Sequence, residues 1–197
     1  MRRRVKAKQL RAKKTVALAR WLLGKHLVRR GRGGRSASWL ITEVEAYDGE
    51  SDLACHARVG RTARTAVMYE PGGVWYLYLC YGTHEMLNLV VGPRDWPAAV
   101  LIRGVDGISG PGRLTRALGI DRRFNGVRAG RAAGLWIEDR GVRVLRTRIE
   151  ATPRIGVAYA GPIWARKRWR FTFDPRASTL PPAKRQRPKS RSRPGRA

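Results

Sequence analysis

The stretch ITEVEAYDGESDLACH, residues 41–56, contains five of the 14 acidic residues of a chain whose formal charge is +28. The segment Ser38–Glu45 follows a glycine- and arginine-rich loop at 30–35, which predicts the returning strand of a hairpin. Side chains two positions apart project from the same face of a strand, so Glu43 and Glu45 share one face. The acidic stretch therefore begins on a strand that carries two neighbouring carboxylates.

The acidic residues after this strand admit two interpretations. Asp48, Glu50 and Asp52 either are balanced by surrounding arginines or cap a helix that begins near Ser51, because acidic side chains are favoured in the first turn of a helix. The sequence alone assigns none of the three a chemical role.

Length and composition predict one folded domain that binds a polyanion. The chain has 197 residues, of which 43% are hydrophobic and seven are Trp, and this is enough apolar material for a buried core. Forty-two Lys and Arg stand against 14 Asp and Glu, with a sequence pI near 11.7. Such a surface attracts nucleic acid first, since the guanidinium group suits bidentate contacts with phosphate. Charge alone does not separate DNA from RNA, or an enzyme from a scaffold.

Cysteine and histidine usage predicts no metal site and no cofactor. Cys55, Cys80 and the three histidines form neither a CxxC nor an HExxH pattern, so two free thiols in a reducing compartment are expected. No apolar run approaches the ~20 residues that span a bilayer. The amphipathic segment 16–24 argues against a discarded leader in the basic residues 1–40. We expect no secretion signal and, in a bacterium, a cytoplasmic protein associated with the nucleoid.

Three regions follow from the pattern along the chain. Residues 1–14 are predicted to be a basic flexible arm, residues 15–181 the folded domain, and residues 182–197 a disordered basic tail. Thr15 is the expected N-cap of the first helix. The predicted helices are 15–23 and 109–119, and the predicted strands are 25–29, 38–45, 74–80, 86–91, 99–103, 135–138 and 169–173.

Five blocks of sequence resemble, in this order, the alkyladenine (3-methyladenine) DNA glycosylase family. They are TEVEAY at 42–47 with His56 downstream, YLYLCYG at 76–82 with Asn88, LIR at 101–103, SGPGRL at 109–114, and RIGV at 154–157 with WARK at 164–167. The resemblance covers about Val16–Phe173. It implies an α+β fold, a single mixed domain with a curved antiparallel β-sheet, a protruding β-hairpin and flanking helices. It also implies a monomeric enzyme that flips an alkylated or deaminated purine out of damaged double-stranded DNA and hydrolyses its N-glycosidic bond, leaving an abasic site.

The resemblance assigns the water-activating group to Glu45. A purine glycosidic bond breaks through an oxocarbenium-like sugar, so an enzyme needs a positioned water, a carboxylate that accepts its proton, and negative charge near the developing cation. By resemblance Glu45 is the general base, while Arg103 and the backbone carbonyl of Ile155 hold the same water. Without the resemblance, a strand carboxylate paired with an arginine is the simpler interpretation of Glu45.

The resemblance also places four side chains around the extruded base and one in the duplex. Tyr47 and Tyr78 stack on the two faces of the base, and His56 hydrogen-bonds its edge. Tyr81, at the hairpin turn, fills the gap left by the flipped nucleotide from the minor groove. Asn88 conflicts with the exocyclic amino group of normal guanine and so excludes it. No lysine at these positions suits covalent strand cleavage, so no lyase activity is expected.

Three positions depart from the family pattern. Thr65 stands where the family commonly has Asn after its Arg-Thr-x-Arg run, which puts the anchoring of that loop in question. Glu85 lies beside the DNA-inserting turn, where it either repels phosphate or pairs with a nearby arginine. Asp48 follows Tyr47, where a hydrophobic residue is commoner, at the expected rim of the pocket.

Two other classes of protein fit parts of the sequence. The charge and the tail after residue 182 also suit a non-catalytic basic protein that binds RNA or chromatin without regard to lesions. Glu43 and Glu45 also suit, as a pair, the acid and nucleophile of a carbohydrate glycosidase. The sequence contains no sugar-binding pattern, which makes the second alternative the more remote one.

Overall fold

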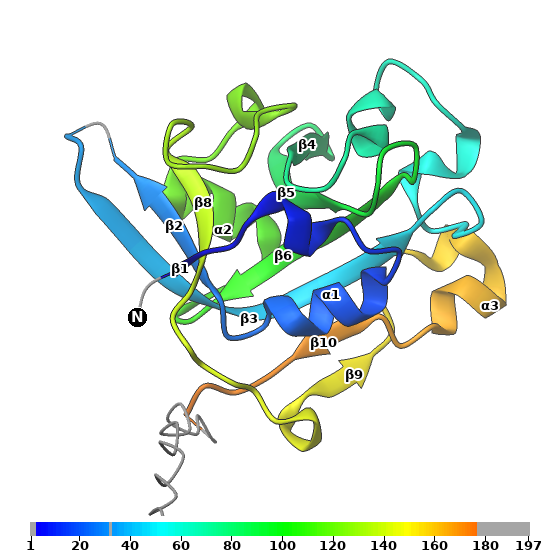
Figure 1. The fold of residues 1–197 in the computed structure, drawn as a ribbon. Helices are drawn as coiled ribbons and strands as arrows, with labels where there is room; N and C mark the ends of the chain where they lie inside the picture. Colours follow the sequence, from blue (N-terminus) through cyan, green and yellow to red (C-terminus); the bar gives the residue numbers. More distant parts are fainter. Residues whose placement is uncertain (1–2, 32, 177–197) are drawn as a thin grey trace, which may run out of the picture.

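An antiparallel sheet forms the centre of the fold (Figure 1). The computed structural model describes residues 3–31 and 33–176, and within them the strands follow the order β1-β8-β2-β3-β6-β5-β4, with β7, β9 and β10 attached beside this path. The strands are β1 (Arg3–Arg4), β2 (His26–Arg30), β3 (Ser36–Asp48), β4 (Trp75–Cys80), β5 (His84–Val91), β6 (Ala98–Val105), β7 (Ile108–Ser109), β8 (Leu135–Asp139), β9 (Glu150–Thr152) and β10 (Arg170–Thr172). The helices are α1 (Thr15–Leu22), α2 (Pro111–Leu118) and α3 (Gly161–Arg166), with short 3-10 helices η1 (Ala7–Leu10), η2 (His56–Val59), η3 (Ala66–Tyr69), η4 (Arg122–Phe124), η5 (Arg146–Arg148) and η6 (Ala158–Ala160). The α+β class implied by the resemblance is thereby confirmed.

Strand β3 runs through the middle of the sheet and joins its two parts. Its first half pairs with β2, and its second half pairs with β6 on one side and with β10 on the other. Both predicted hairpins are present: β2 with β3, which projects at the left of Figure 1, and β4 with β5. The remaining predicted strands correspond to β6, β8 and β10, and the predicted second helix corresponds to α2.

The pairing of β3 with β6 is interrupted beside the two carboxylates. Glu43 pairs with Gly104, whereas the next residue of β3 pairs with Ile102, so Arg103 is an extra residue in β6. A β-bulge of this kind bends the strand and redirects a side chain. Arg103 Nε lies 2.9 Å from Glu43 Oε1 and 3.5 Å from Glu45 Oε1. This common partner confirms that the two carboxylates share one face.

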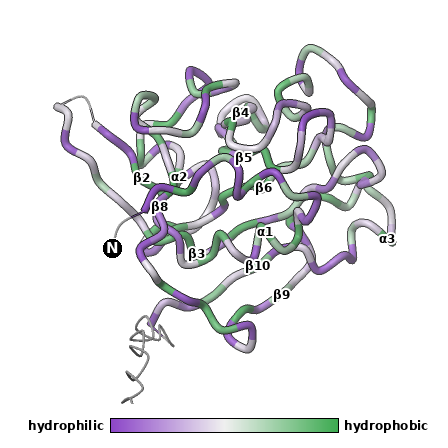
Figure 2. The backbone as a smooth tube through the Cα atoms, viewed as in Figure 1, coloured by the Kyte–Doolittle hydropathy of each residue, from purple (hydrophilic) through white to green (hydrophobic). Residues whose placement is uncertain are grey.

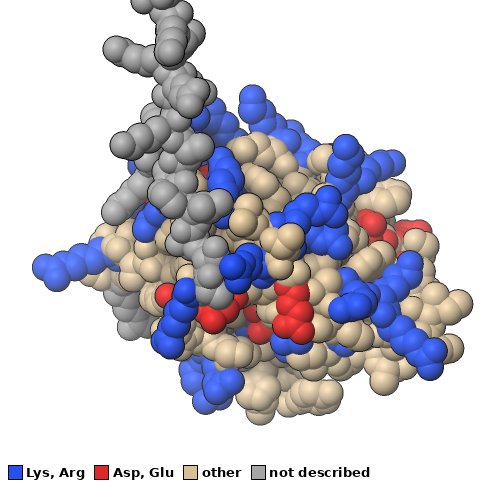
Figure 3. All heavy atoms as spheres, turned by 90° about the horizontal axis from the view of Figure 1, so that it is seen from below, with Lys and Arg blue, Asp and Glu red and all other residues tan. Residues whose placement is uncertain are grey.

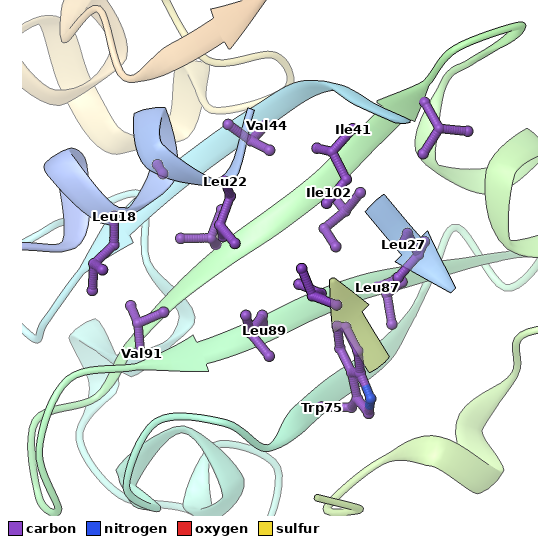
Figure 4. Close-up of a cluster of buried hydrophobic side chains, with 14 of the residues drawn as sticks. Leu18, Leu22, Leu27, Ile41, Val44, Trp75, Leu87, Leu89, Val91 and Ile102 are labelled. Atoms are coloured by element: carbon purple, nitrogen blue, oxygen red, sulfur yellow. The ribbon is translucent and has the colours of Figure 1, made fainter. Parts of the chain in front are cut away.

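The residues that alternate with these carboxylates face the main core. Val44 and Ala46 are fully buried and pack with apolar side chains of α1. Ile41, which the register shift between Ile41 and Glu43 separates from this alternation, is buried in the same core. Figure 4 shows core side chains converging from α1 and from β2 to β6, and Figure 2 shows hydrophobic residues concentrated along α1 and the central strands. Each large apolar side chain buried in this way stabilises the fold by roughly 1.5–3 kcal/mol. A second, smaller apolar cluster covers the opposite face of the sheet, between the loop after β3 and strands β4 to β6.

One expectation and one of the two alternatives about helices are wrong. Thr15 is the first residue of α1 rather than its N-cap, and its hydroxyl donates to Asp48 Oδ1 at 2.6 Å instead of to the helix backbone. Within the described residues no helix begins near Ser51; the chain instead passes through turns from there to η2. Asp52 is fully buried, and its carboxylate accepts the backbone N–H groups of Asp48 and Ala54. These acidic residues therefore fold the loop on itself.

The expectation of a flexible arm at residues 1–14 is wrong for the part that the structure describes. Strand β1 pairs with β8, and Val5 and Leu10 are buried in the main core. The carbonyl of Leu10 also accepts the N–H of Gly92 at 2.7 Å. Two apolar side chains anchor the segment, while the charged ends of its Lys and Arg side chains stay in water. The expected disordered tail at 182–197 lies outside the described residues.

Candidate active site

A cavity of about 490 Å³ lies on the side of the sheet opposite the main core. Seven of the eight residues predicted for the site line it: Tyr47, His56, Tyr78, Tyr81, Asn88, Arg103 and Ile155. The eighth, Glu45, is fully buried behind the wall and contacts three of the lining residues. The fold thus brings all eight residues together around one space.

Two hydrogen bonds and one ion pair hold the carboxylate of Glu45. Its Oε1 accepts the backbone N–H of Ile155 at 2.8 Å, and its Oε2 accepts the hydroxyl of Tyr47 at 2.8 Å. Arg103 Nε lies 3.5 Å from Oε1. Burial raises the pKa of Glu45, and the charge of Arg103 and the two hydrogen bonds offset part of this increase. The result is a carboxylate that is a stronger base than an exposed one and whose orientation is fixed.

Arg103 is in turn oriented by Glu43. Its Nε donates to Glu43 Oε1 at 2.9 Å, and Arg170 Nε donates to the same oxygen at 2.7 Å. One oxygen of Glu43 is therefore occupied by two guanidinium groups. This pairing argues against a carbohydrate glycosidase with Glu43 and Glu45 as its acid and nucleophile, because a carboxylate paired with two arginines is held in its ionised form and has no proton to donate.

His56 and two tyrosines form one wall of the cavity. The rings of His56 and Tyr78 meet edge to face with their centroids 4.4 Å apart, and His56 Nδ1 lies 2.9 Å from the hydroxyl of Tyr76. Burial and the nearby charges of Arg64 and Arg58 lower the pKa of His56 to about 4, so the ring is neutral at physiological pH. A neutral imidazole has one donor and one acceptor nitrogen, which suits it to hydrogen-bond the edge of a base.

Tyr76 is a site residue that the sequence analysis missed. It lines the cavity two positions before Tyr78 on β4, and the centroids of the two rings are 5.6 Å apart. Burial raises the pKa of Tyr76 to about 12, so its hydroxyl keeps its proton beside His56. The period of two along a strand is the signal that identifies Tyr76, since it places both rings on one face.

Asn88 is fixed at the wall of the cavity by two hydrogen bonds. It is buried, and its Nδ2 donates to the backbone carbonyls of Tyr76 and Met86, each at 3.2 Å. Both amide hydrogens are used in this way, so Oδ1 is the polar atom that remains for a ligand. A side chain held this rigidly can reject a ligand whose shape conflicts with it.

Tyr81 stands at the tip of the β4–β5 hairpin, at the rim of the cavity. Its side chain is 89% exposed, and its φ of 49° lies in the left-handed region that residues other than glycine rarely adopt. The ring therefore does not pack on its own hairpin. An exposed aromatic residue in a strained turn beside a cavity is typical of a position that contacts a partner.

The structure accommodates each of the three departures from the family pattern. Thr65 donates to a backbone carbonyl of its own loop at 2.9 Å and accepts an N–H from it at 2.8 Å, so the loop is anchored. Glu85 pairs with Arg122 at 3.3 Å, which compensates its charge. Asp48 accepts the indole N–H of Trp96 at 3.2 Å in addition to its bond from α1.

The surface and the remaining side chains add three observations. Lys and Arg side chains are spread over the face shown in Figure 3, with smaller acidic areas between them. Cys55 and Cys80 are free thiols. Among the residues that the structure describes, no group of three or more His, Cys, Asp and Glu could hold a metal ion, and no helix is long and apolar enough to cross a bilayer.

Comparison with known proteins identifies the family of this chain. The sequence model of the family described as methylpurine-DNA glycosylase (MPG) matches residues 9–109 and 105–177. A relative from Anaeromyxobacter sp. (strain Fw109-5) is 43% identical over 175 residues, which cover 85% of this chain and 88% of the relative. A relative from Methanocella arvoryzae is 44% identical over 177 residues (80% and 86%), and one from Myxococcus xanthus is 40% identical over 188 residues (90% and 95%).

Each of these relatives is named, provisionally, a 3-methyladenine DNA glycosylase. The match to the family model extends over most of the chain and includes every residue that lines the cavity. By these similarities the chain belongs to the methylpurine-DNA glycosylase family of DNA repair enzymes.

Proposed function

We propose that this protein is a base-excision-repair enzyme that extrudes an alkylated or deaminated purine from duplex DNA and hydrolyses its N-glycosidic bond with a water activated by Glu45. The observation that carries this proposal is the position of Glu45, a fully buried carboxylate held by two hydrogen bonds and an ion pair beside a cavity lined with aromatic rings. Burial disfavours the charged form of a carboxyl group, so a carboxylate in such a place is a candidate for catalysis.

In the proposed reaction the oxygen of the water forms a bond to the anomeric carbon of the deoxyribose while the bond from that carbon to the purine nitrogen breaks. The electron pair of the broken bond leaves with the purine, and the water transfers its proton to Glu45. Arg103 and the backbone carbonyl of Ile155 hold this water. The negative charge of Glu45 also stabilises the oxocarbenium-like sugar, and the product is an abasic site.

Four side chains hold the extruded base in this proposal. Tyr47 and Tyr78 stack on its two faces, His56 hydrogen-bonds its edge, and Asn88 excludes guanine. The support is that all four line one cavity and that three of them have fixed hydrogen-bond partners. Tyr81, exposed at the rim, takes the place of the flipped nucleotide in the duplex.

The reaction stops at the abasic site in this proposal, without cleavage of the strand. A lyase reaction needs an amine nucleophile, and no Lys of the described residues lines the cavity. An alkylated purine carries a positive charge and leaves readily, so water and Glu45 suffice for it. A non-catalytic basic protein is less favoured, because binding alone gives no reason to bury Glu45. We expect the enzyme to act as a monomer on chromosomal DNA.

The test is single-turnover release of the base from a duplex that contains one hypoxanthine or ethenoadenine, detected as an alkali-labile site, with wild type and Glu45→Gln in parallel. Release by the wild type alone supports both the reaction and the role of Glu45. Equal release by Glu45→Gln contradicts the assigned mechanism. No release from either these duplexes or methylated DNA, together with tight binding to undamaged DNA, favours the non-catalytic alternative.

A further inference from the structure

Arg154 and Asp52 form an ion pair that is completely removed from solvent. Arg154 Nη1 lies 2.5 Å from Asp52 Oδ2, and Nη2 lies 2.9 Å from Oδ1, with both side chains fully buried. The two parallel contacts give the bidentate geometry that makes an arginine–carboxylate pair strong and directional. Two charges are buried at a large desolvation cost, so their geometry has to be held by the surrounding fold.

Arg154 also connects this pair to β3, to α3 and to Trp169. Nη1 donates to the carbonyl of Ala46 in β3 at 2.8 Å, and Nη2 donates to that of Trp164 in α3 at 3.4 Å. The guanidinium lies against the ring of Tyr47, 4.8 Å from its centroid, and against the ring of Trp169 at 5.1 Å. A single side chain thereby ties β3, the loop of the acidic stretch, and α3 together.

Arg154 therefore lies next to both residues that donate hydrogen bonds to Glu45. Tyr47, which rests on the guanidinium, donates to Glu45 Oε2 and lines the cavity. Ile155, the next residue in the chain, donates its N–H to Glu45 Oε1. Because Asp52 neutralises Arg154, the group beneath the Tyr47 ring has no net charge.

We propose that the Asp52–Arg154 pair positions Tyr47 and Ile155 around Glu45. The pair also keeps the group against one face of the Tyr47 ring neutral, so that a positively charged alkylated purine is accepted on the opposite face of the ring. This inference rests on the proposed function and adds a determinant of substrate class to it. An unpaired guanidinium under the ring repels a cationic base, and charges interact strongly where water is excluded. A neutral deaminated base does not experience this repulsion. Loss of the Asp52 charge therefore changes selectivity as well as rate.

The test compares the wild type with Asp52→Asn, Arg154→Lys and a matched control, Asp139→Asn. Asp139 pairs with the buried Lys25 at 3.1 Å on strand β8 and does not line the cavity. Single-turnover rates at saturating enzyme are measured on two duplexes, one with 3-methyladenine, which is cationic and lacks the exocyclic amino group that Asn88 excludes, and one with hypoxanthine, which is neutral. Thermal unfolding of each variant and its binding to an abasic duplex report on folding.

Asp52→Asn is expected to lower the ratio of the 3-methyladenine rate to the hypoxanthine rate about tenfold. Arg154→Lys keeps the charges of the pair but loses the two-pronged contact, so we expect both rates to fall about tenfold with an unchanged ratio. Asp139→Asn is expected to unfold at a lower temperature, with rates and ratio like those of the wild type.

If Asp52→Asn folds and shows the same two excision rates and the same rate ratio as the wild type, the proposal is overturned. The Asp52–Arg154 pair then affects the reaction no more than the control pair of Asp139 and Lys25 does. If Asp52→Asn does not fold, Arg154→Lys decides: lowered rates with retained binding to the abasic duplex support the proposal, and wild-type rates overturn it. A wild-type enzyme that is inactive on both duplexes contradicts the proposed function instead, and the inference falls with it. The two failures are therefore distinguishable.

Discussion

The backbone N–H of Ile155 donates a hydrogen bond of 2.8 Å to Oε1 of Glu45, across 110 residues of sequence. The donor is a peptide group, so the contact does not depend on the side chain at position 155. It fixes one carboxylate oxygen, while the hydroxyl of Tyr47 fixes the other. The orientation of Glu45 is therefore determined by two segments that only the folded chain brings together.

Stability and activity are expected to depend on pH in opposite directions. Burial raises the pKa of Glu45 above that of the unfolded chain, so the folded state binds this proton more tightly. The wild type therefore loses stability relative to Glu45→Gln as pH rises through the raised pKa. Excision instead falls as pH drops through the same pKa, because the base must be ionised. Urea unfolding and single-turnover rates between about pH 4 and 8 measure both effects, and a stability difference that is independent of pH contradicts the shift.

Tyr47→Phe tests the hydrogen bond from the hydroxyl to Glu45. The bond favours the ionised carboxylate, so its removal should raise the pKa of Glu45 further and move the acid limb of the pH–rate profile upward by about one pH unit. The ring that stacks on the base is kept, so the rate on the alkaline side of the limb should stay within about threefold of the wild type. Tyr78→Phe is the matched control, since no hydrogen bond joins its hydroxyl to Glu45. A limb that moves equally in both variants argues against the assigned contact.

His56 is expected to remain neutral throughout the physiological pH range. Burial and the charges of Arg64 and Arg58 lower its pKa to about 4. The imidazole signal of His56 in NMR spectra can be assigned because it is absent from His56→Asn. This signal should not titrate between about pH 5.5 and 8. Arg64→Gln removes one of the two charges and should raise this pKa. A His56 signal that titrates near the ordinary value of about 6.5 contradicts the buried, neutral ring.

The regular elements of this fold follow from local patterns, whereas several long-range contacts do not. The alternation in β3 predicts that Glu43 and Glu45 share a face, and that much is confirmed by their common contact with Arg103. No pattern in the sequence predicts that Asp52 meets Arg154, because such pairs are chosen by the tertiary fold. The acidic stretch thus serves two purposes: Glu45 lies at the cavity, while Asp52 anchors the loop around it.

The packing of the N-terminal segment is a second long-range feature that the sequence pattern does not predict. Its basic composition predicts a flexible arm, yet Leu10 is only 3% exposed. Leu10→Ala is therefore expected to lower the free energy of unfolding by about 2–5 kcal/mol, as for other large apolar side chains removed from a core. Lys8→Ala, an exposed neighbour, is the control and should change it by less than about 0.5 kcal/mol. Urea unfolding measures both, and equal small effects mean that the segment does not pack as described.

Tyr81→Gly is expected to separate stability from function. Glycine removes the strain of the left-handed φ of 49° but adds freedom to the unfolded chain, so the free energy of unfolding should stay within about 1 kcal/mol of the wild type. Excision from duplex DNA should fall at least about tenfold, because nothing then holds the gap left by the flipped base open. Excision from a single strand has no such gap and should be unchanged, and Tyr81→Phe, which keeps the ring, should resemble the wild type on both. An equal loss on duplex and single strand means that Tyr81 acts on the base or the sugar and not as a wedge in the duplex.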